Sequence, residues 1–203
     1  NGICSIGYPV VAVVPFVTFT RDEQERFVAD SIAHDVSVRL SRFSWFQVID
    51  YLATRSSLTE RYVPQETAAR LHAHYFLAGT IRRKADHYRV TVTLAHTDCA
   101  VTIWSGEFEI RCPGDGGGGT DSIVDQVVNT VGDLFGALAG SVWSASRHKP
   151  LDEITAVEAV IRQMHYETHL SDEMHAFALK AVTRTVRDHP DFAWGWAALA
   201  GLH

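Results

Sequence analysis

Three neighbouring stretches decide the fold of this chain: HYFLAGTIRRK (residues 74–84), YRVTVTLAHT (88–97) and VTIWSGEFEIRC (101–112). In the second stretch, apolar side chains alternate with polar ones such as Arg89 and Thr91, and a period of two is typical of a half-buried β-strand. The connections between the stretches are short enough for hairpins. The pattern therefore predicts a three-stranded antiparallel meander.

The residues before the meander predict further strands and helices. Residues 10–19 (VVAVVPFVTF) are apolar and β-branched, which indicates a buried strand ending near Pro15, because proline cannot donate to a sheet. Residues 20–42 have helical apolar spacing, residues 46–52 alternate like a strand, and residues 64–73 open with proline like a short helix. We expect an α/β fold of the two-layer α+β type, in which a mixed sheet of about five strands carries helices on one face.

A glycine-rich stretch, residues 113–119 (PGDGGGG), follows the meander and is predicted to be a flexible connector. In residues 120–142, apolar side chains recur at every third or fourth position, which predicts one long helix. Glycines at positions 132, 136 and 140 lie on one ridge of that helix. This ridge predicts close packing of the helix against the sheet.

The sequence divides into two expected domains. Residues 1–149 form the α/β domain, Lys149-Pro150 ends it, and residues 150–203 are helical throughout. The chain begins without an initiator methionine and stops inside a predicted helix at His203. We therefore interpret it as a fragment of a longer protein.

Composition excludes several classes of protein. The 203 residues are 46% hydrophobic, which is enough to build a core and excludes a disordered polymer. A net charge of -6 disfavours general nucleic-acid binding, which needs a basic face. No apolar run approaches the roughly 20 residues of a membrane span. The three cysteines form no C-x-x-C pair, which favours a reducing compartment or no role for cysteine.

Two motifs resemble sites of known chemistry. Residues 114–119 are glycine-rich, but a phosphate-binding loop needs Gly-Lys-Ser/Thr before its helix, and Asp121 would repel a phosphate. His165 and His169 share one helix face at a spacing that can chelate zinc, yet Glu167 is misplaced for a metalloprotease base. Serine and cysteine also lack the context of a nucleophile. We predict no catalytic residue, cofactor or metal.

Short motifs in a specific order give the chain a family resemblance. Over residues 9 to 147 it resembles the TolB N-terminal-like (FlgO-like) domain of bacterial adenylate/guanylate cyclases and of CadC-type winged-helix transcriptional activators. The resemblance implies an α/β domain placed between an output domain and TPR repeats. It rests on Pro15-Phe16, Phe27-Val28-Ala29-Asp30, Leu40-Ser41-Arg42, Phe46-Gln47-Val48-Ile49, residues 75–82 (YFLAGTIR) and Thr102-Ile103-Trp104-Ser105.

Residues 150–203 resemble the start of TPR repeats. Ala178, Val182 and Thr185 occupy positions where a repeat's second helix carries small or apolar residues, and Pro190 ends that repeat. The next repeat opens with a W-x-x-L pattern at Trp196. Because a solenoid repeat cannot bury its face alone, this resemblance implies further repeats in the parent protein.

The resemblance implies a regulatory or protein-interaction module without catalysis of its own, in a cyclase or a transcriptional regulator. We expect protein partners to bind through the TPR-like region, with Trp194, Trp196, Arg82 and Arg83 as candidate contact residues. For each of these four, packing or solvation is the alternative reading. We also expect self-association into a homo-dimer, no direct contact with nucleic acid and no membrane insertion.

A second function remains open from the sequence. The chain could sense a small ligand, a nucleotide or metabolite, bound between the sheet and residues 113–120. We expect a cytoplasmic location, or a periplasmic one if the parent protein has a membrane span before this region. The output domain of the parent decides between these locations.

Overall fold

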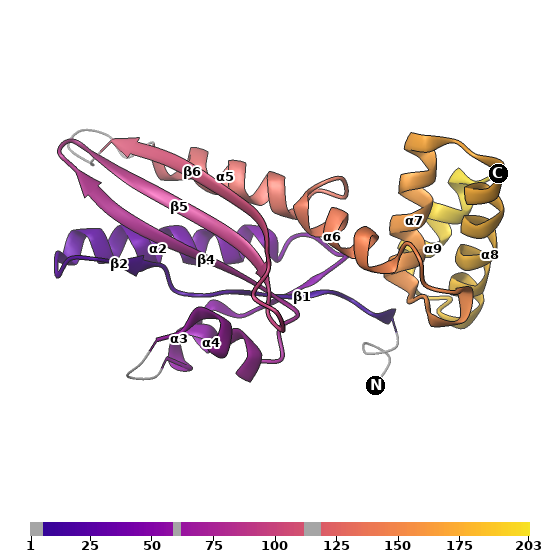
Figure 1. The fold of residues 1–203 in the computed structure, drawn as a ribbon, viewed down its shortest axis with the longest axis horizontal. Helices are drawn as coiled ribbons and strands as arrows, with labels where there is room; N and C mark the ends of the chain where they lie inside the picture. The colour runs from indigo at the N-terminus through magenta and orange to yellow at the C-terminus, as the bar shows by residue number, and fades with distance from the viewer. Residues whose placement is uncertain (1–5, 59–61, 112–118) are drawn as a thin grey trace. The chain divides into compact units, whose positions relative to one another are not determined.

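A computed structural model describes residues 6–58, 62–111 and 119–203. The chain divides into two compact units (Figure 1). One, the sheet unit, comprises Pro9–Ala137. The other, the helical unit, comprises Leu138–His203 together with Asn1–Tyr8. The boundary at residues 149–150 between a TolB-like domain and TPR-like repeats stays a prediction.

The sheet unit is built on a mixed six-stranded sheet in the order β3-β1-β4-β5-β6, with β2 pairing β4 beside this path. The strands β1, β2 and β3 run parallel to their neighbours, and β4, β5 and β6 form the antiparallel meander that the sequence predicts. The α+β fold class is therefore confirmed. The strands are β1 (Val10–Val13), β2 (Val17–Thr18), β3 (Gln47–Ile49), β4 (Tyr75–Lys84), β5 (His87–His96) and β6 (Thr102–Arg111).

Pro15 interrupts the first strand where the sequence predicts. The strand β1 ends at Val13, and pairing with β4 resumes at β2, after the proline. Tyr62 donates a hydrogen bond of 2.6 Å to the Pro15 carbonyl, so this carbonyl has a partner at the break in the strand pairing. The Phe16 ring then lies over Gly79 of β4, where a Cβ atom would come within 2.6 Å of the ring. Glycine is needed at position 79 because the ring takes that space.

Two helices cover one face of the sheet. Helix α2 (Glu23–Leu40) begins at Asp22, whose carboxylate accepts the Gln24 N–H at 2.9 Å, and it buries a stripe that includes Val28, Ile32, Val36 and Leu40. Helix α5 (Gly119–Gly132) runs beside it (Figure 1). Arg39 of α2 forms ion pairs with Asp121 and Asp125 of α5, which tie the two helices together.

The opposite face also carries a helix, so the expectation of helices on one face is wrong. In α4 (Pro64–Arg70), Ala68 packs in a separate cluster with Ala12 and Phe76 of the sheet. Successive side chains of a strand point to opposite faces, so this cluster lies on the face away from Val11 and Leu77. Small alanine side chains permit this close second layer.

Residues 51–52 are helical, although the sequence pattern predicts that a strand continues through them. Helix α3 (Tyr51–Ser56) begins after Asp50, whose carboxylate accepts the N–H groups of Leu52 and Ala53 at 2.9 and 3.2 Å. Such a cap satisfies the free N–H groups of the first turn. The local cap therefore overrides the apolar alternation.

The predicted single helix over residues 120–142 is two helices, α5 and α6 (Ala137–Ser146). The Asp133 carboxylate accepts the Phe135 N–H at 2.8 Å and stabilises the turn between them. A Cβ at Gly132 would come within 2.6 Å of the Phe43 ring, whereas Gly140 has nothing within 4 Å. The three glycines therefore form no common packing ridge. Gly132 makes a close approach, but to Phe43 in the segment after α2 and not to a strand of the sheet.

The helical unit contains α6, a short 3-10 turn at Leu151–Glu153, α7 (Ala156–His169), α8 (Asp172–Asp188) and α9 (Ala193–Gly201). The last three helices pack on one another. Thr155 and Glu158 form a capping box at the start of α7, and Glu158 also pairs with Lys149 at 2.8 Å. In the part of the chain that the structure describes, no helix combines the length and apolarity that crossing a membrane requires.

Replacing Gly79 tests the contact between Phe16 and β4. We expect Gly79→Ala to lower the free energy of unfolding by about 1–3 kcal/mol, because the new methyl group overlaps the ring. Urea unfolding measures the change. The matched substitution Gly140→Ala meets open space in a helix and is expected to be neutral or to stabilise by up to about 1 kcal/mol. Equal effects of the two substitutions would contradict this account of Gly79.

Candidate functional site

One end of the sheet collects basic side chains. We call this group, Arg82, Arg83, Lys84, His87 and Arg111, the basic end. It lies at the turn between β4 and β5 and at the last residue of β6. The register sets Lys84 opposite His87, and His87 opposite Arg111. A row of cationic or titratable groups directly opposite one another costs stability. Such an arrangement is a candidate binding site for negative charge.

Two residues farther along the strands, on the same face of the sheet, Arg82 of β4 lies opposite Arg89 of β5. Arg89 is compensated, because Glu107 and Glu109 of β6 both lie 3.5 Å from its guanidinium. Among the described residues, no carboxylate lies within ion-pair distance of Arg82 or Lys84. These two cations are exposed. They are the groups through which the basic end can bind a partner.

The two predicted contact residues on β4 are held differently. The Arg82 guanidinium lies 4.1 Å from the centre of the Phe19 ring, and this ring is 58% exposed. Arg83 points to the other face of the strand and pairs with Asp22, the cap of α2, at 3.4 Å. Arg83 therefore supports the fold as well as the surface charge, whereas Arg82 with Phe19 presents a cation beside an exposed ring.

The turn at the basic end adds one permanent negative charge. Asp86 lies 3.2 Å from His87, and the hydrogen bond with His87 lowers the pKa of the Asp86 carboxyl group. The backbone at Asp86 lowers the pKa further. Asp86 is therefore ionised at neutral pH and adds a negative charge at the turn of the basic end.

Trp194 and Trp196 lie in the first half of α9, in the helical unit. Trp196 is 51% exposed, and its indole N–H donates to the Pro190 carbonyl at 2.8 Å. Trp194 is half-buried. The hydrogen bond holds the Trp196 ring in one orientation while its apolar surface stays accessible. The tryptophans and the two arginines belong to different compact units, so they are two separate candidate surfaces.

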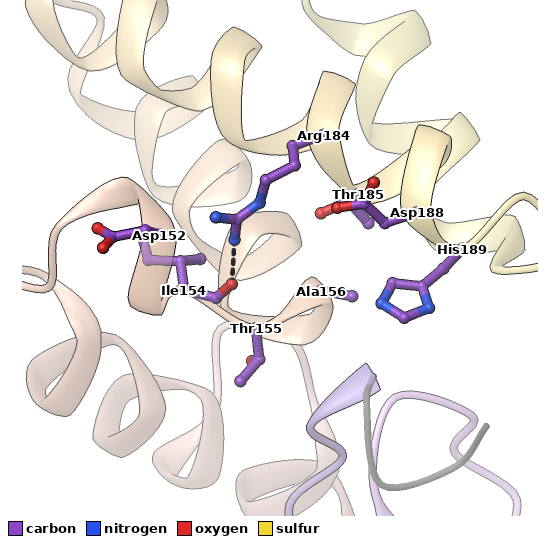
Figure 2. A pocket seen from close by; sticks show the side chains of 8 residues that line it. All are labelled: Asp152, Ile154, Thr155, Ala156, Arg184, Thr185, Asp188 and His189. Atoms are coloured by element: carbon purple, nitrogen blue, oxygen red, sulfur yellow. Dashed lines mark hydrogen bonds between the residues drawn. The ribbon is translucent and has the colours of Figure 1, made fainter. Parts of the chain in front are cut away.

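A polar cavity of about 250 Å³ lies between the start of α7 and the end of α8 (Figure 2). Arg184 spans it and donates hydrogen bonds to the carbonyls of Leu151 and Ile154. The hydrogen bond from Arg187 lowers the pKa of Asp188. The cavity is smaller than the roughly 300–1,000 Å³ of most ligand pockets. Its lining is Asp152, Ile154, Thr155, Ala156, Arg184, Thr185, Asp188 and His189.

Sequence reasoning missed this cavity. The capping box at Thr155 was a readable signal for the start of a helix, but no local pattern indicates that Arg184 lies opposite it. The ligand site expected between the sheet and residues 113–120 falls largely on residues 112–118, outside the described residues.

The histidine pair on α7 has a structural explanation. His165 stacks on Trp143, with the ring centres 4.3 Å apart and 12° between the planes, and the His169 ring lies 6.3 Å farther along. Partial burial lowers the pKa of His165, and the charge of His169 lowers it further. In the described ranges, no three potential ligands gather where they could hold a metal ion. The spacing of the two histidines serves ring stacking here.

A second polar cluster lies at the contact of α2 with α3. Asp30 accepts a hydrogen bond from the Tyr51 hydroxyl at 3.1 Å and pairs with Arg55 at 3.2 Å. Burial, followed by the nearby Asp30 carboxylate, raises the pKa of Tyr51. His34 touches the Tyr51 ring edge-on. These contacts join two helices, and they give the Asp30 of the first helix a structural role that the sequence does not reveal.

Comparisons with known proteins give distant similarities. No family model matches the chain. "Putative adenylate cyclase 3" of Rhizobium meliloti is 24% identical over 101 residues, which are 50% of this chain but only 17% of that cyclase. Similar solved structures include a PelC dodecamer of Paraburkholderia phytofirmans (18% identity, TM-score 0.41, 62% of this chain and 86% of that one). They also include TolB of Acinetobacter baumannii (17%, TM-score 0.40, 66% and 29%) and a lipoprotein of Neisseria meningitidis (16%, TM-score 0.43, 62% and 98%).

Acidification tests the stack of His165 on Trp143. Because the pKa of His165 is lower in the folded chain than in the unfolded chain, the unfolded state binds the proton more readily. The contribution of His165 to the free energy of unfolding is therefore fully present above the unfolded pKa of about 6.5, and it is lost as the pH drops below that value. We expect acidification to lower the melting temperature of the wild type more than that of His165→Gln.

The control is His148→Gln, which removes an exposed histidine. It should lose as much stability on acidification as the wild type does. Circular dichroism melting curves on both sides of the histidine pKa provide the measurement. An unchanged pH dependence in His165→Gln would show that the stack does not couple protonation to folding.

Proposed function

We propose that this chain is a non-catalytic interaction module of a larger bacterial signalling protein, and that its basic end docks an acidic segment of a protein partner. The observation that carries the proposal is the register of β4, β5 and β6, which sets Lys84, His87 and Arg111 side by side across three strands. Among the residues that the structure describes, neither Arg82 nor Lys84 has a carboxylate within ion-pair distance. The distant similarity to a cyclase supports the signalling context.

The shifted pKa values support an interaction role over catalysis. The raised pKa of Tyr51 follows from its burial against Asp30, and the lowered pKa of Asp188 follows from Arg187. The lowered pKa of His165 follows from its partial burial and then from the charge of His169. At a catalytic site, several groups with shifted pKa values face the same cleft. These three groups instead each stabilise a local contact.

The helical unit is proposed to act as the start of a TPR-like array that adds a second protein-binding surface. Ala178, Val182 and Thr185 of α8 are buried, as the second helix of such a repeat requires. Gly195 of α9 lies close to α8, where a Cβ would come within 3.2 Å of Thr185. The exposed Trp196 would then contact a following repeat or a partner. We propose a cytoplasmic location for this arrangement.

Charge reversal tests the basic end. We expect the double variant Arg82→Glu, Lys84→Glu to weaken binding of a fluorescent glutamate-rich peptide by about ten-fold, because two cation contacts are lost and two repulsions are added. Fluorescence anisotropy at low and moderate salt measures the affinity. Binding to the wild type should weaken as salt rises, since exposed charges are screened.

The matched control is Arg147→Glu, Lys180→Glu, which changes the net charge equally at exposed positions of the helical unit. It should bind the peptide within about two-fold of the wild type. Equal losses in the two double variants would mean that overall charge, and not the basic end, attracts the peptide. Absence of any binding to the wild type would refute the proposal.

Small-ligand sensing is the second candidate function. The polar cavity in Figure 2 favours it for a ligand, or a part of one, that fits about 250 Å³. A nucleotide or metabolite that binds the folded chain should stabilise it by about 2.7 kcal/mol when its concentration is 100 times its dissociation constant. Thermal-shift screening would detect this, and Asp188→Asn should reduce the shift if the ligand occupies the cavity. Absence of a shift across a broad metabolite library argues against this function.

A further inference from the structure

The strand β6 is a long edge of the sheet. Among the described strands, it pairs only with β5, so its outer side presents unpaired N–H and C=O groups over residues 102–111. Proteins commonly protect such edges with short length, proline, lysine or a bulge. Here the strand has ten residues and contains neither proline nor lysine. The one irregularity, between Leu94 and Ala95 of β5, lies near the start of β6.

The acidic side chains of β6 are drawn toward the inside of the sheet. Glu107 and Glu109 both lie 3.5 Å from Arg89 on β5, and His87 is 3.7 Å from Glu109. Arg89 therefore compensates part of their charge within their own sheet. These two carboxylates therefore repel an incoming strand less strongly. A strand that places its own carboxylate directly opposite one of them is still repelled.

The other face of β6 is aromatic. The rings of Trp104 and Phe108 have centres 6.4 Å apart, and both rings are half-buried. They close over Gly106, where a Cβ would come within 2.7 Å of Trp104 and 2.9 Å of Phe108. The edge therefore has a mainly apolar row on the face that α2 and α5 cover and a mainly polar row on the other face, and a partner strand must match both.

A second copy of β6 can meet this requirement. Paired residues in an antiparallel sheet lie on the same face, so only registers that pair odd with odd and even with even positions are allowed. Two such registers give nearly complete overlap of the strand. One places Glu107 opposite the Glu107 of the other copy. The other places Gly106 opposite Gly106, Trp104 opposite Phe108, and Ser105 opposite Glu107.

We propose that two copies of this chain associate through β6 in the second register and form one continuous sheet around a two-fold axis. This pairing joins the Trp104 and Phe108 rings of both copies into a single aromatic cluster. It places no like charges opposite each other along the strand. The same sequence therefore supplies both sides of the interface, as a two-fold symmetric contact requires.

The register makes a specific prediction about Ser105, an exposed residue that faces Glu107 of the other copy in this pairing. We expect Ser105→Lys to tighten the dimer by about three- to ten-fold, because two symmetry-related cross-strand ion pairs form. Ser105→Glu should weaken it by a similar factor, because two like-charge pairs form. Sedimentation equilibrium of the 203-residue chain from micromolar to millimolar concentration measures the dissociation constants.

Thr102→Lys and Thr102→Glu are the matched controls, because Thr102 is exposed but faces the apolar Ile110 in this register. Their two dimer constants should agree with each other. Circular dichroism melting at a dilute, monomeric concentration shows whether each variant folds. A chain that stays monomeric at all concentrations overturns the proposal. So does a folded dimer whose strength is the same in both Ser105 variants, because such a dimer uses another surface.

Discussion

The pairing of β4 with its neighbours on both sides is the constraint on which the sheet unit depends. On one side β4 pairs in parallel with β1 and β2, and on the other it pairs antiparallel with all ten residues of β5. The pairing with β4 is interrupted at Pro15, and there the Phe16 ring packs over Gly79 of β4. Parallel strands need long connections, which here carry α2, α3 and α4. The helices on both faces thus follow from the position of β4.

The surface chemistry follows from the same strand. The strands β4 and β5 are joined by a tight turn, so the RRK sequence at the end of β4 lies opposite residues 87–89 of β5, and the last residues of β6 lie on the other side of β5. Part of the cost of opposing like charges is relieved at Arg89, which pairs with two glutamates of β6. Those same contacts compensate part of the negative charge along β6. One cross-strand arrangement thus shapes both the proposed docking site for an acidic partner and the proposed edge for a second copy.

Predictions from the sequence succeeded where local periodicity decides the outcome, and failed where a single contact overrides it. The meander, the first helix and the interruption at Pro15 follow from spacing and side-chain type. The helix at residues 51–56 was missed because the Asp50 cap outweighs the alternation, and the break between α5 and α6 was missed because Asp133 binds the Phe135 N–H. For the site, Arg82 and Arg83 could be named as basic residues, but Phe19 and Asp22 as their partners could not.

The sequence alone determined the strands of the meander, the first helix, the net charge of -6 and the absence of a familiar catalytic motif. These properties depend on residues close together in the chain. Only the tertiary structure decided that Arg82 lies opposite Arg89, that Arg184 spans a cavity with Thr155 on its wall, and that β6 is an edge. Such pairings depend on which distant segments become neighbours. Burial and strand order set that outcome over the whole fold, and no local pattern encodes it.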